Sequence, residues 1–519
     1  MANRVGRKSG AGTYRPLIGA VLSAVIPGAG QWYAGERRRG LRFFWIAMGV
    51  GLPAIALLVM VFYVEGVDLA LDIARPFFEH PNLLLALLAL NGLLLLFRVV
   101  CVVDAFLLPV RAAPVRRGPG RVSMWAVLGG AAVLVAVMLP HGWVARRNLS
   151  AYDLFTYDFT ADPGQITTTT PPPTTTVPPP TTSPPVSVAS STTTSTSTTT
   201  TSTTTTTTMP DPFDGFERVN VLLLGGDAGV GRSGIRTDTM IVVSIDPTTG
   251  WTAMFSVTRG TAQIPMPDDI PAYDAYGCHC YPGIANEIYQ YGLRNPEGFP
   301  GGPNTGGNAV KAILGNLLGV DIHYFALVDL QGFVDVVDAV GGVTITVTER
   351  VYDPAYPHED GSTEVIDIQP GTYDMDGHRA LAYARSRRMS DDYDRMGRQR
   401  CVVEALAEQA EPVSLLRQLP DLVPAIKGTV ITDIPIASIP DFLDLLSRAD
   451  LETIPSIRFM WRAPEFEGTP TSYVAGWTSD RYPIPNVALI RETVQTALSM
   501  PPAEAIETLN LQPIEEICG

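Results

Sequence analysis

The sequence predicts a mixed α/β fold, in which a central sheet is layered with helices, preceded by an α-helical transmembrane module. Three observations lead to this prediction: long apolar runs near the N-terminus, a stretch made almost wholly of Thr, Pro and Ser, and short strand-like runs that alternate with helical patterns. At 519 residues the chain is too long for one hydrophobic core, so we expect separate units.

The first predicted unit is a membrane module over residues 1–150. It contains three apolar runs, at residues 43–64, 83–108 and 124–144. Each has about the 20 residues that a helix needs to cross a bilayer, so we predict about three transmembrane helices. An earlier apolar segment, residues 17–33, is interrupted by Pro27-Gly28-Ala29-Gly30, and we interpret it as re-entrant or interfacial.

Two arginine clusters indicate the orientation of this module. One cluster precedes the first run, at residues 37–42, and the other lies between the second and third runs, at residues 111–121. Cytoplasmic loops carry an excess of Lys and Arg, so both clusters should face the cytoplasm. We therefore predict a multi-pass protein of the cell membrane whose C-terminal domain is extracellular.

A linker should join the module to that domain. Residues 166–208 are almost wholly Thr, Pro and Ser, a composition with too little apolar surface to offset the entropy of ordering. We assign residues 151–213 to a disordered extracellular linker.

From residue 214 the sequence has the mixed apolar and polar pattern of a globular domain. Strand-like runs occupy residues 219–224, 240–245 and 342–347, and helical patterns occupy residues 308–318, 398–408, 436–446 and 486–498. We expect one α/β domain over residues 214–412, with residues 413–519 as an extension packed on it.

Arginine is concentrated in one short segment of an acidic protein. The net charge of −15 argues against binding nucleic acid, which requires a basic face. Residues 385–400 nevertheless carry six arginines: Arg385, Arg387, Arg388, Arg395, Arg398 and Arg400. A guanidinium group can donate two parallel hydrogen bonds to phosphate oxygens, so this segment suits a pyrophosphate.

The alternative is a solvated charged face that pairs with neighbouring aspartates. The apolar run at residues 380–384 favours the binding site, and in an extended segment Arg385 and Arg387 would point the same way.

Two carboxylates add a candidate metal site. Asp227 follows the first strand-like run, and Asp238 comes just before the second. Carboxylates at strand ends suit a divalent cation that bridges phosphates. Taken singly, each aspartate is also typical of a turn or a helix cap.

Several dispersed motifs together resemble the LytR-CpsA-Psr family. The resemblance covers about residues 219–408 and rests on Arg236-Thr237-Asp238-Thr239, Ser256-Val257-Thr258-Arg259, Leu318-Gly319-Val320-Asp321, Asp338-Ala339-Val340-Gly341-Gly342, Gly377-His378-Arg379-Ala380-Leu381-Ala382-Tyr383-Ala384-Arg385-Ser386-Arg387, and Asp394-Arg395 with Gln399. Only three lysines accompany the many arginines, a bias of GC-rich genomes that suggests an actinobacterial member.

The resemblance implies a phosphotransferase that moves a glycan from a polyprenyl pyrophosphate carrier to peptidoglycan with Mg²⁺. It implies no soluble nucleotide, because the carrier's own pyrophosphate supplies the energy. By this resemblance, Asp227 and Asp238 would hold the metal, and the catalytic residues would be Arg259, Arg385 and Arg387. The residues implied to bind the pyrophosphate are Arg236, Arg259, Arg385, Arg387, Arg395 and Gln399.

The chain departs from the family pattern at two points. Gly260 stands where the family commonly has an aspartate, and no lysine precedes Asn286, a position for which Arg294 is a candidate substitute. These departures keep two further functions open: a non-catalytic binder or scaffold, and a hydrolase of lipid pyrophosphates.

Cysteines complete the sequence-based picture. Four of the five lie in the C-terminal half. We expect two disulfides, in which Cys278 and Cys280 each pair with Cys401 or Cys518, because a direct bridge between residues so close in sequence would be strained. Free thiols, or a metal site at residues 278–280, are the alternatives.

Overall fold

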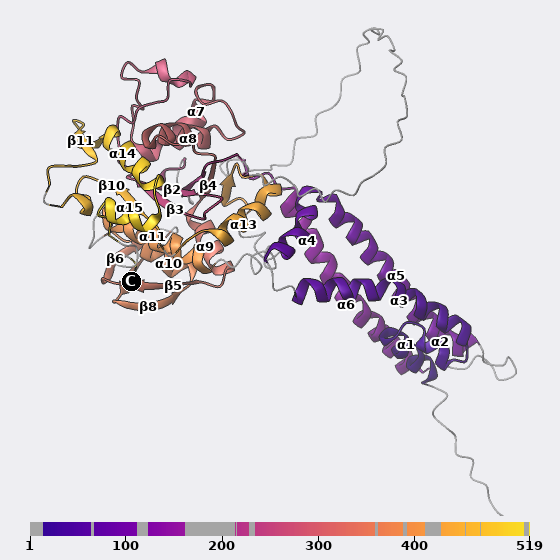
Figure 1. Ribbon diagram of the computed structural model, residues 1–519. Helices are drawn as coiled ribbons and strands as arrows, with labels where there is room; N and C mark the ends of the chain where they lie inside the picture. The colour runs from indigo at the N-terminus through magenta and orange to yellow at the C-terminus, as the bar shows by residue number, and fades with distance from the viewer. Residues whose placement is uncertain are drawn as a thin grey trace, which may run out of the picture.

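The computed structural model shows an α/β body from which an arm of helices extends (Figure 1). It describes residues 14–63, 67–111, 123–160, 213, 215–227, 234–358, 362–387, 392–409, 427–451, 453–467, 469–512 and 518. The predicted class, a mixed sheet layered with helices and preceded by apolar helices, is confirmed.

The arm consists of α1 (Arg15–Val25), α2 (Ala29–Tyr33), α3 (Arg37–Tyr63), α4 (Val67–Glu79), α5 (Asn82–Arg111) and α6 (Met124–Phe155). Within the described residues, two segments are long and apolar enough to cross a membrane, Asn82–Pro109 and Met124–Phe155. They coincide with the second and third predicted spans. The first predicted span falls on α3, but its last residue, 64, lies outside the described residues.

The segment that we interpreted as re-entrant forms α1, a turn and α2, which pack against α5. A Cβ on Gly30 would lie 2.0 Å from the carbonyl oxygen of Gly19, so only glycine permits this close approach. The next side chain, Gln31, is fully buried and donates to the carbonyl oxygen of Cys101 at 2.8 Å. Its Nε2 also lies 3.2 Å from Oδ2 of Asp104. The Pro27-Gly28-Ala29-Gly30 interruption thus allows α1, α2 and α5 to pack closely together.

The start of the predicted linker is wrong. We expected a disordered linker from residue 151, but α6 continues to Phe155 and the chain then contacts the body. The carbonyl oxygen of Phe159 accepts from the amide of Thr432 at 2.9 Å, and that of Thr160 accepts from Asn304 at 3.0 Å. Apolar residues such as Leu154 and Phe159 pack with Ile436, which explains why this segment is ordered. Residues 161–212 lie outside the described residues.

A six-stranded sheet forms the centre of the body. Its strands are β1 (Val219–Gly226), β2 (Thr237–Ile245), β3 (Thr252–Val257), β4 (Tyr324–Val328), β9 (Val430–Thr432) and β10 (Ser456–Phe459), in the order β10-β3-β2-β1-β4-β9. The β1–β4 and β3–β10 pairs are parallel, and the other three pairs are antiparallel. Both edge strands come from residues 413–519, so the extension completes the sheet as well as packing on it.

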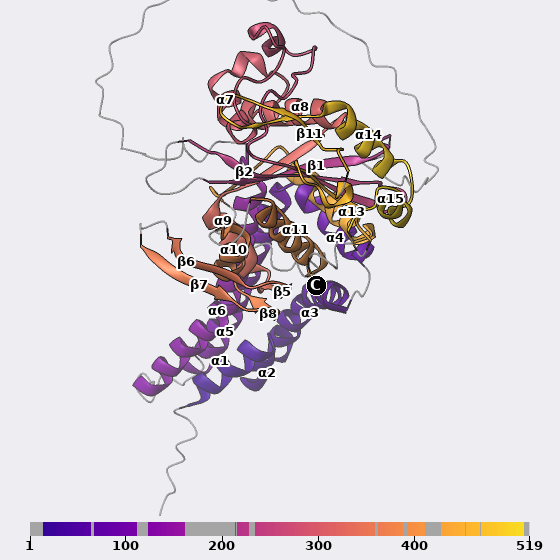
Figure 2. The same ribbon diagram turned by 90° about the vertical axis from the view of Figure 1, so that its left-hand side faces the viewer.

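Alternating side chains give the sheet two different faces. Leu222 and Leu224 point into the main core, which is shared with α7 (Ile288–Arg294), α8 (Thr305–Leu318) and α14 (Val487–Leu498). Leu223, between them, points to the opposite face. Figure 2 shows that α9 (Leu330–Ala339), α10 (Gly377–Arg385) and α11 (Asp392–Gln409) cover this second face.

Short hairpins and helices surround the two layers. Three two-stranded sheets pair β5 (Val343–Val347) with β8 (Gly371–Met375), β6 (Val351–Pro357) with β7 (Thr363–Ile368), and β11 (Val474–Trp477) with β12 (Pro483–Pro485). The last two of these are hairpins. The remaining helices are α13 (Ile439–Arg448) and α15 (Pro502–Thr508), with 3₁₀ turns at Pro271–Ala275, Ala285–Glu287, Pro296–Gly298, Ile436–Ser438 and Pro464–Phe466. The predicted strands and helices all occur, but α8 and α11 begin earlier than their apolar patterns.

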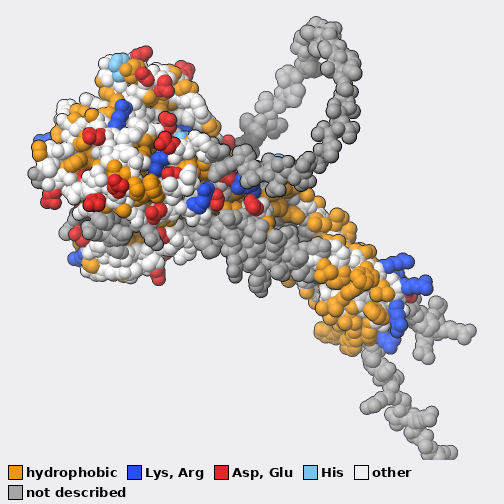
Figure 3. Space-filling model, in the orientation of Figure 1, with side chains coloured by type: hydrophobic (Ala, Val, Ile, Leu, Met, Phe, Trp, Pro, Cys, Tyr) orange, Lys and Arg blue, Asp and Glu red, His pale blue; other side chains and the backbone are white. Residues whose placement is uncertain are grey.

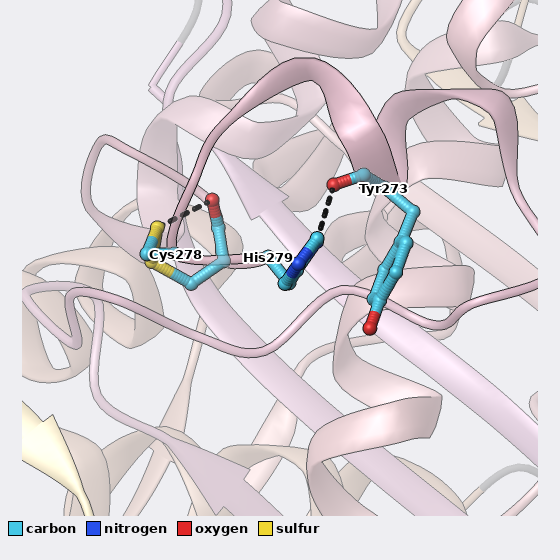
Figure 4. Close-up of a disulfide and its surroundings, with 4 residues drawn as sticks. Tyr273, Cys278 and His279 are labelled. Atoms are coloured by element: carbon cyan, nitrogen blue, oxygen red, sulfur yellow. Dashed lines mark hydrogen bonds between the residues drawn. A yellow bond between two sulfur atoms is a disulfide. The ribbon is translucent and has the colours of Figure 1, made fainter.

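The predicted disulfide pairing is wrong. Cys278 bonds directly to Cys280, and Cys401 bonds to Cys518. The short bridge forms because His279 adopts a left-handed conformation, with φ of 51°, which leaves the two Cα atoms 5.1 Å apart. Figure 4 shows the ring of His279 beside that of Tyr273, at a centroid distance of 4.2 Å.

Candidate functional site

A cavity of about 1040 Å³ separates the second face of the sheet from α9, α10 and α11. Leu223 and Ile241 form its floor, and side chains of the three helices form its roof. The apolar lining consists mainly of Leu223, Ile241, Ala326, Val328, Leu330, Phe333, Val336, Val340, Leu381, Ala384, Val402, Val403, Leu406 and Ala407. A space of this size and lining suits a long apolar group.

Charged and polar side chains line the same cavity. Six of the eight residues that the sequence singled out are among them: Asp227, Asp238, Arg385, Arg387, Arg395 and Gln399. The fold thus brings together residues that are separated by more than 170 positions in the sequence.

Backbone hydrogen bonds bring the two aspartates together where β1 ends and β2 begins. The amide of Asp227 donates to the carbonyl oxygen of Arg236 at 2.8 Å, and the amide of Asp238 lies 3.2 Å from the same oxygen. The register of the β1–β2 pair shifts between Gly225 and Gly226, just before this point. Because one carbonyl accepts from both amides, the main-chain positions of the two aspartates relative to each other are set by these hydrogen bonds.

The carboxylate of Asp238 is held as an anion. Its Oδ2 accepts from Nη1 of Arg259 at 2.7 Å, and its Oδ1 accepts from Nδ2 of Asn286 at 2.8 Å. Burial alone would raise the pKa of Asp238, but the hydrogen bond from Asn286 and the charges of Arg259 and Arg395 outweigh it and lower that pKa. Asp238 therefore remains ionised at neutral pH.

Arg385 connects the other aspartate to the cavity wall. Its Nη2 lies 3.6 Å from Oδ1 of Asp227, and its Nη1 donates to the hydroxyl of Tyr356 at 3.3 Å. The extended segment in which Arg385 and Arg387 would point the same way does not occur before Arg385, because Gly377–Arg385 is a helix capped by Asp376. Arg385 is the last residue of that helix, where the dipole favours a cation, and Arg387 follows it with its side chain also on the cavity.

The arginines on α11 point in different directions: Arg395 lines the cavity, whereas Arg398 and Arg400 do not. Arg395 and Gln399 are four residues apart, share one helix face and are both buried. Nη1 of Arg395 donates to the carbonyl oxygen of Asp238 at 3.2 Å. Arg398 instead points back to α10, donating to the carbonyl oxygen of Tyr383 at 2.8 Å, and Arg400 is fully buried outside the cavity lining. The alternative of a solvated face does not describe these buried residues, and Arg388 lies outside the described part of the chain.

Two predicted binding residues do not line the cavity. Arg259 lies behind Asp238 and acts on the site through that carboxylate. The side chain of Arg236 is 68% exposed and points to Glu287, with Nη2 at 3.9 Å from Oε1. Arg294, the candidate substitute for the family lysine, is exposed at the end of α7 and is also absent from the cavity lining.

Comparison with known proteins identifies the family. The sequence profile described as the LytR_cpsA_psr family matches residues 186–475, which is more than half of the chain. The chain belongs to this family. The match includes the six-stranded sheet and all of the cavity-lining residues, and its first part falls in residues outside the described structure.

Two curated relatives of the family are similar over the same region. The polyisoprenyl-teichoic acid–peptidoglycan teichoic acid transferase TagU of Oceanobacillus iheyensis is 29% identical over 220 residues, which cover 42% of this chain and 59% of that protein. The probable cell wall biosynthesis protein LcpB of Corynebacterium glutamicum is 29% identical over 253 residues, which cover 44% of this chain and 52% of that protein. The chain thus spans little more than half the length of these relatives.

A solved structure is also similar. Protein gbs0355 of Streptococcus agalactiae matches 55% of this chain and 90% of its own, at 23% identity and a TM-score of 0.42.

The two aspartates of this family member fit a magnesium ion by their donor chemistry. Mg²⁺ prefers carboxylate oxygens, and an ionised carboxylate has about four lone-pair sites. In the described contacts, each oxygen of Asp238 accepts one hydrogen bond, which leaves further lone pairs for a metal ion. Both residues line the cavity.

The family aspartate that Gly260 replaces would meet no obstruction. Among the described parts of the chain, a Cβ on Gly260 would have only Cδ1 of Tyr482 within 4 Å, at 3.7 Å, which is an ordinary contact. The glycine is therefore not required by packing.

Sequence reasoning missed two contributors to the site. Asn286 holds one oxygen of Asp238, and Tyr356 lies between Arg385 and the rim of the cavity. Asn286 lies in a 3₁₀ turn, where the family pattern drew attention to the missing lysine before it and not to the asparagine itself. Tyr356 lies in a strand, and no local sequence pattern marks it.

Proposed function

We propose that this chain is a cell-wall glycopolymer transferase, which moves a polyprenyl-pyrophosphate-linked glycan to peptidoglycan and releases lipid monophosphate. One observation carries the proposal: arginine and aspartate side chains stand on an apolar cavity of about 1040 Å³, so one site offers separate surfaces for a pyrophosphate and for a lipid. The names of the curated relatives, a teichoic acid transferase and a cell wall biosynthesis protein, support the same activity.

The pyrophosphate would bind Arg385, Arg387, Arg395 and Gln399. Guanidinium groups stay charged at every relevant pH, and each can donate two parallel hydrogen bonds to phosphate oxygens. The polyprenyl chain would lie along the cavity, where leucine and valine side chains replace water around it. Arg259 would act by holding Asp238, and Arg236 would reach the substrate only if its exposed side chain turned toward the cavity.

Asp227 and Asp238 would hold Mg²⁺. When bound, the ion would neutralise charge on the phosphate oxygens. Asp238 is suited to this role because the hydrogen bonds from Arg259 and Asn286 keep it ionised and fixed.

The transfer would require no covalent enzyme intermediate. A hydroxyl oxygen of peptidoglycan would form a bond to the phosphorus that carries the glycan, and the bond from that phosphorus to the bridging oxygen would break. The bridging oxygen would leave on the lipid phosphate with the electron pair, and the proton of the attacking hydroxyl would pass to that phosphate. The arginines would stabilise the negative charge that develops on this leaving group.

We further propose that the cavity lies outside the cell and that the arm is a multi-span membrane module of actinobacterial type, with α3 as a third span. The surface of the arm is largely hydrophobic, and Lys and Arg side chains gather at its end remote from the body (Figure 3). Arg37, Arg38, Arg39 and Arg42 are exposed at the start of α3, near that end. The positive-inside rule then favours a cytoplasmic location for that end and an extracellular one for the body.

The test uses the purified full chain in detergent with a lipid-pyrophosphate oligosaccharide, peptidoglycan fragments and Mg²⁺. We expect glycan on the fragments and an equal amount of lipid monophosphate. Release of lipid monophosphate without glycan transfer would favour a hydrolase. Binding of the lipid without any release, while another family member is active in parallel, would favour a non-catalytic binder and refute both enzymatic activities.

A further inference from the structure

Two histidines and a glutamate meet at the rim of the cavity. His358 follows β6, Glu364 belongs to β7, and His378 lies in the first turn of α10. Nε2 of His378 is 2.6 Å from Oε1 of Glu364, and Nε2 of His358 is 3.6 Å from the same oxygen. All three ligand atoms lie within 4.8 Å of one another. No step of the proposed transfer uses them.

The two imidazoles are arranged to share one partner. Their rings are nearly parallel, with an interplanar angle of 7° and centroids 5.4 Å apart, and both Nε2 atoms lie within 4 Å of the same oxygen of Glu364. Tyr356 packs its ring against the edges of both, at 6.2 Å and 6.3 Å, and is almost fully buried. The buried tyrosine therefore contacts both imidazole rings, while the three side chains of the cluster are 32–46% exposed.

We propose that His358, Glu364 and His378 form a binding site for a zinc ion. Two imidazole nitrogens with one carboxylate oxygen make a common ligand set for Zn²⁺, with a fourth position left for water. Tetrahedral zinc with bonds of about 2.0–2.1 Å places its ligand atoms about 3.3 Å apart. The observed separations bracket this value, and side chains that are 32–46% exposed have room to adjust. A bound zinc ion would take the place of the direct hydrogen bond between Glu364 and His378.

The ligands come from two segments, the β6–β7 hairpin with His358 and Glu364 and the start of α10 with His378. A bound ion would fasten the β6–β7 hairpin to the start of α10, beside the tyrosine whose hydroxyl accepts from Arg385 at 3.3 Å. The positive end of α10 disfavours a cation, but the carboxylate of Asp376, which caps this helix, offsets that effect. The site is distinct from the aspartates that we assign to Mg²⁺, and it does not depend on the proposed transferase activity.

Direct metal binding tests the proposal. The full chain, in detergent and without a histidine tag, is titrated with Zn²⁺ against a chromophoric chelator, with excess Mg²⁺ present to occupy carboxylate sites. We expect one tight Zn²⁺ per chain. The double variant His358→Ala/His378→Ala should weaken this binding at least about 100-fold, since removing even outer partners of metal ligands costs about 10–100-fold.

Two variants make the outcome decisive. Glu364→Gln keeps the size and a hydrogen bond of the side chain, so its fold is retained, and the rise in melting temperature that Zn²⁺ gives the natural chain should be absent. His80→Ala removes an exposed histidine at the end of α4 and should bind Zn²⁺ as the natural chain does. Equal affinity in the natural chain and the double variant, or an equal loss in His80→Ala, would overturn the proposal.

Discussion

A Cβ on Gly260 would lie 3.7 Å from Cδ1 of Tyr482, and no other atom of the described residues, its immediate chain neighbours aside, would lie within 4 Å of it. The position that carries an aspartate in the family pattern is therefore open in this chain. It directly follows Arg259, whose side chain holds Asp238.

We expect Gly260→Asp to fold normally and to raise Mg²⁺-dependent transfer by about tenfold, which corresponds to about 1.4 kcal/mol of activation free energy. The added carboxylate would supply a further metal ligand or proton acceptor. Transfer rate as a function of Mg²⁺ concentration measures the effect. Gly260→Ala is the matched control, because it adds the Cβ without the carboxylate, and equal rates in the two variants would show that the aspartate is dispensable here.

Arg385→Ala and Arg387→Ala should each weaken binding of a polyprenyl pyrophosphate. Each removes a charge-assisted contact worth about 1.5–3 kcal/mol, which is a loss of about 10–150-fold in affinity. Calorimetric titration with a short-chain prenyl pyrophosphate measures this loss.

Arg379→Ala is the control for these variants. It removes a guanidinium from the same helix, but one that stacks on Tyr373 away from the cavity lining. If all three variants lost affinity equally, or none did, the arginines would contribute only to the overall positive charge of this region and would not form a defined binding site.

The central strands and the aspartates could be predicted from the sequence, whereas several side-chain directions could not. The leucines at 222–224 lie in a short buried strand, and a buried strand has a clear local signal. The edge strands β9 and β10 have only three and four residues, too few for any periodicity. Arg236 matched the family pattern in sequence, but it precedes β2, and only the fold shows its side chain turned toward Glu287.

The helix before Arg385 was missed for a related reason. Small and apolar residues at 380–384 suit a buried strand as well as a buried helix, and the deciding cap, Asp376, lies outside that run. The short disulfide was missed because it depends on one dihedral angle, that of His279, which no sequence pattern specifies.

Asp238→Asn should reduce stability at neutral pH and have little effect in acid. The pKa of Asp238 in the folded chain lies below its ordinary value of 3.8, because its hydrogen bond to Asn286 and the charges of Arg259 and Arg395 outweigh burial. Its contribution is therefore complete above that ordinary value and is lost as the pH falls through the lower, folded-state pKa.

Melting temperatures of the natural chain and of Asp238→Asn, followed from about pH 7 to about pH 3, measure this contribution. The difference between the two should shrink as the pH falls. Asn286→Ala should show a smaller version of the same pattern, because it removes one of the hydrogen bonds to the carboxylate. A constant difference at every pH would mean that the charge of Asp238 does not contribute.

The two disulfides should differ in their effect on stability. Cys401 and Cys518 are 117 positions apart, whereas Cys278 and Cys280 are separated by two. In the chain-entropy account, opening the long loop costs about 4–5 kcal/mol and opening the short one about 1.5 kcal/mol. The long bridge also fastens the C-terminus to α11, the helix that carries Arg395 and Gln399.

We therefore expect Cys518→Ser to lower the melting temperature more than Cys280→Ser does, and to weaken prenyl pyrophosphate binding as well. Both variants leave one free thiol, so each is the control for the other. Because Cys280 lies far in sequence from α11 and outside the cavity lining, Cys280→Ser should bind the ligand normally. A larger loss of stability in Cys280→Ser would show that local contacts of the short bridge, such as the packing of His279 on Tyr273, outweigh loop entropy.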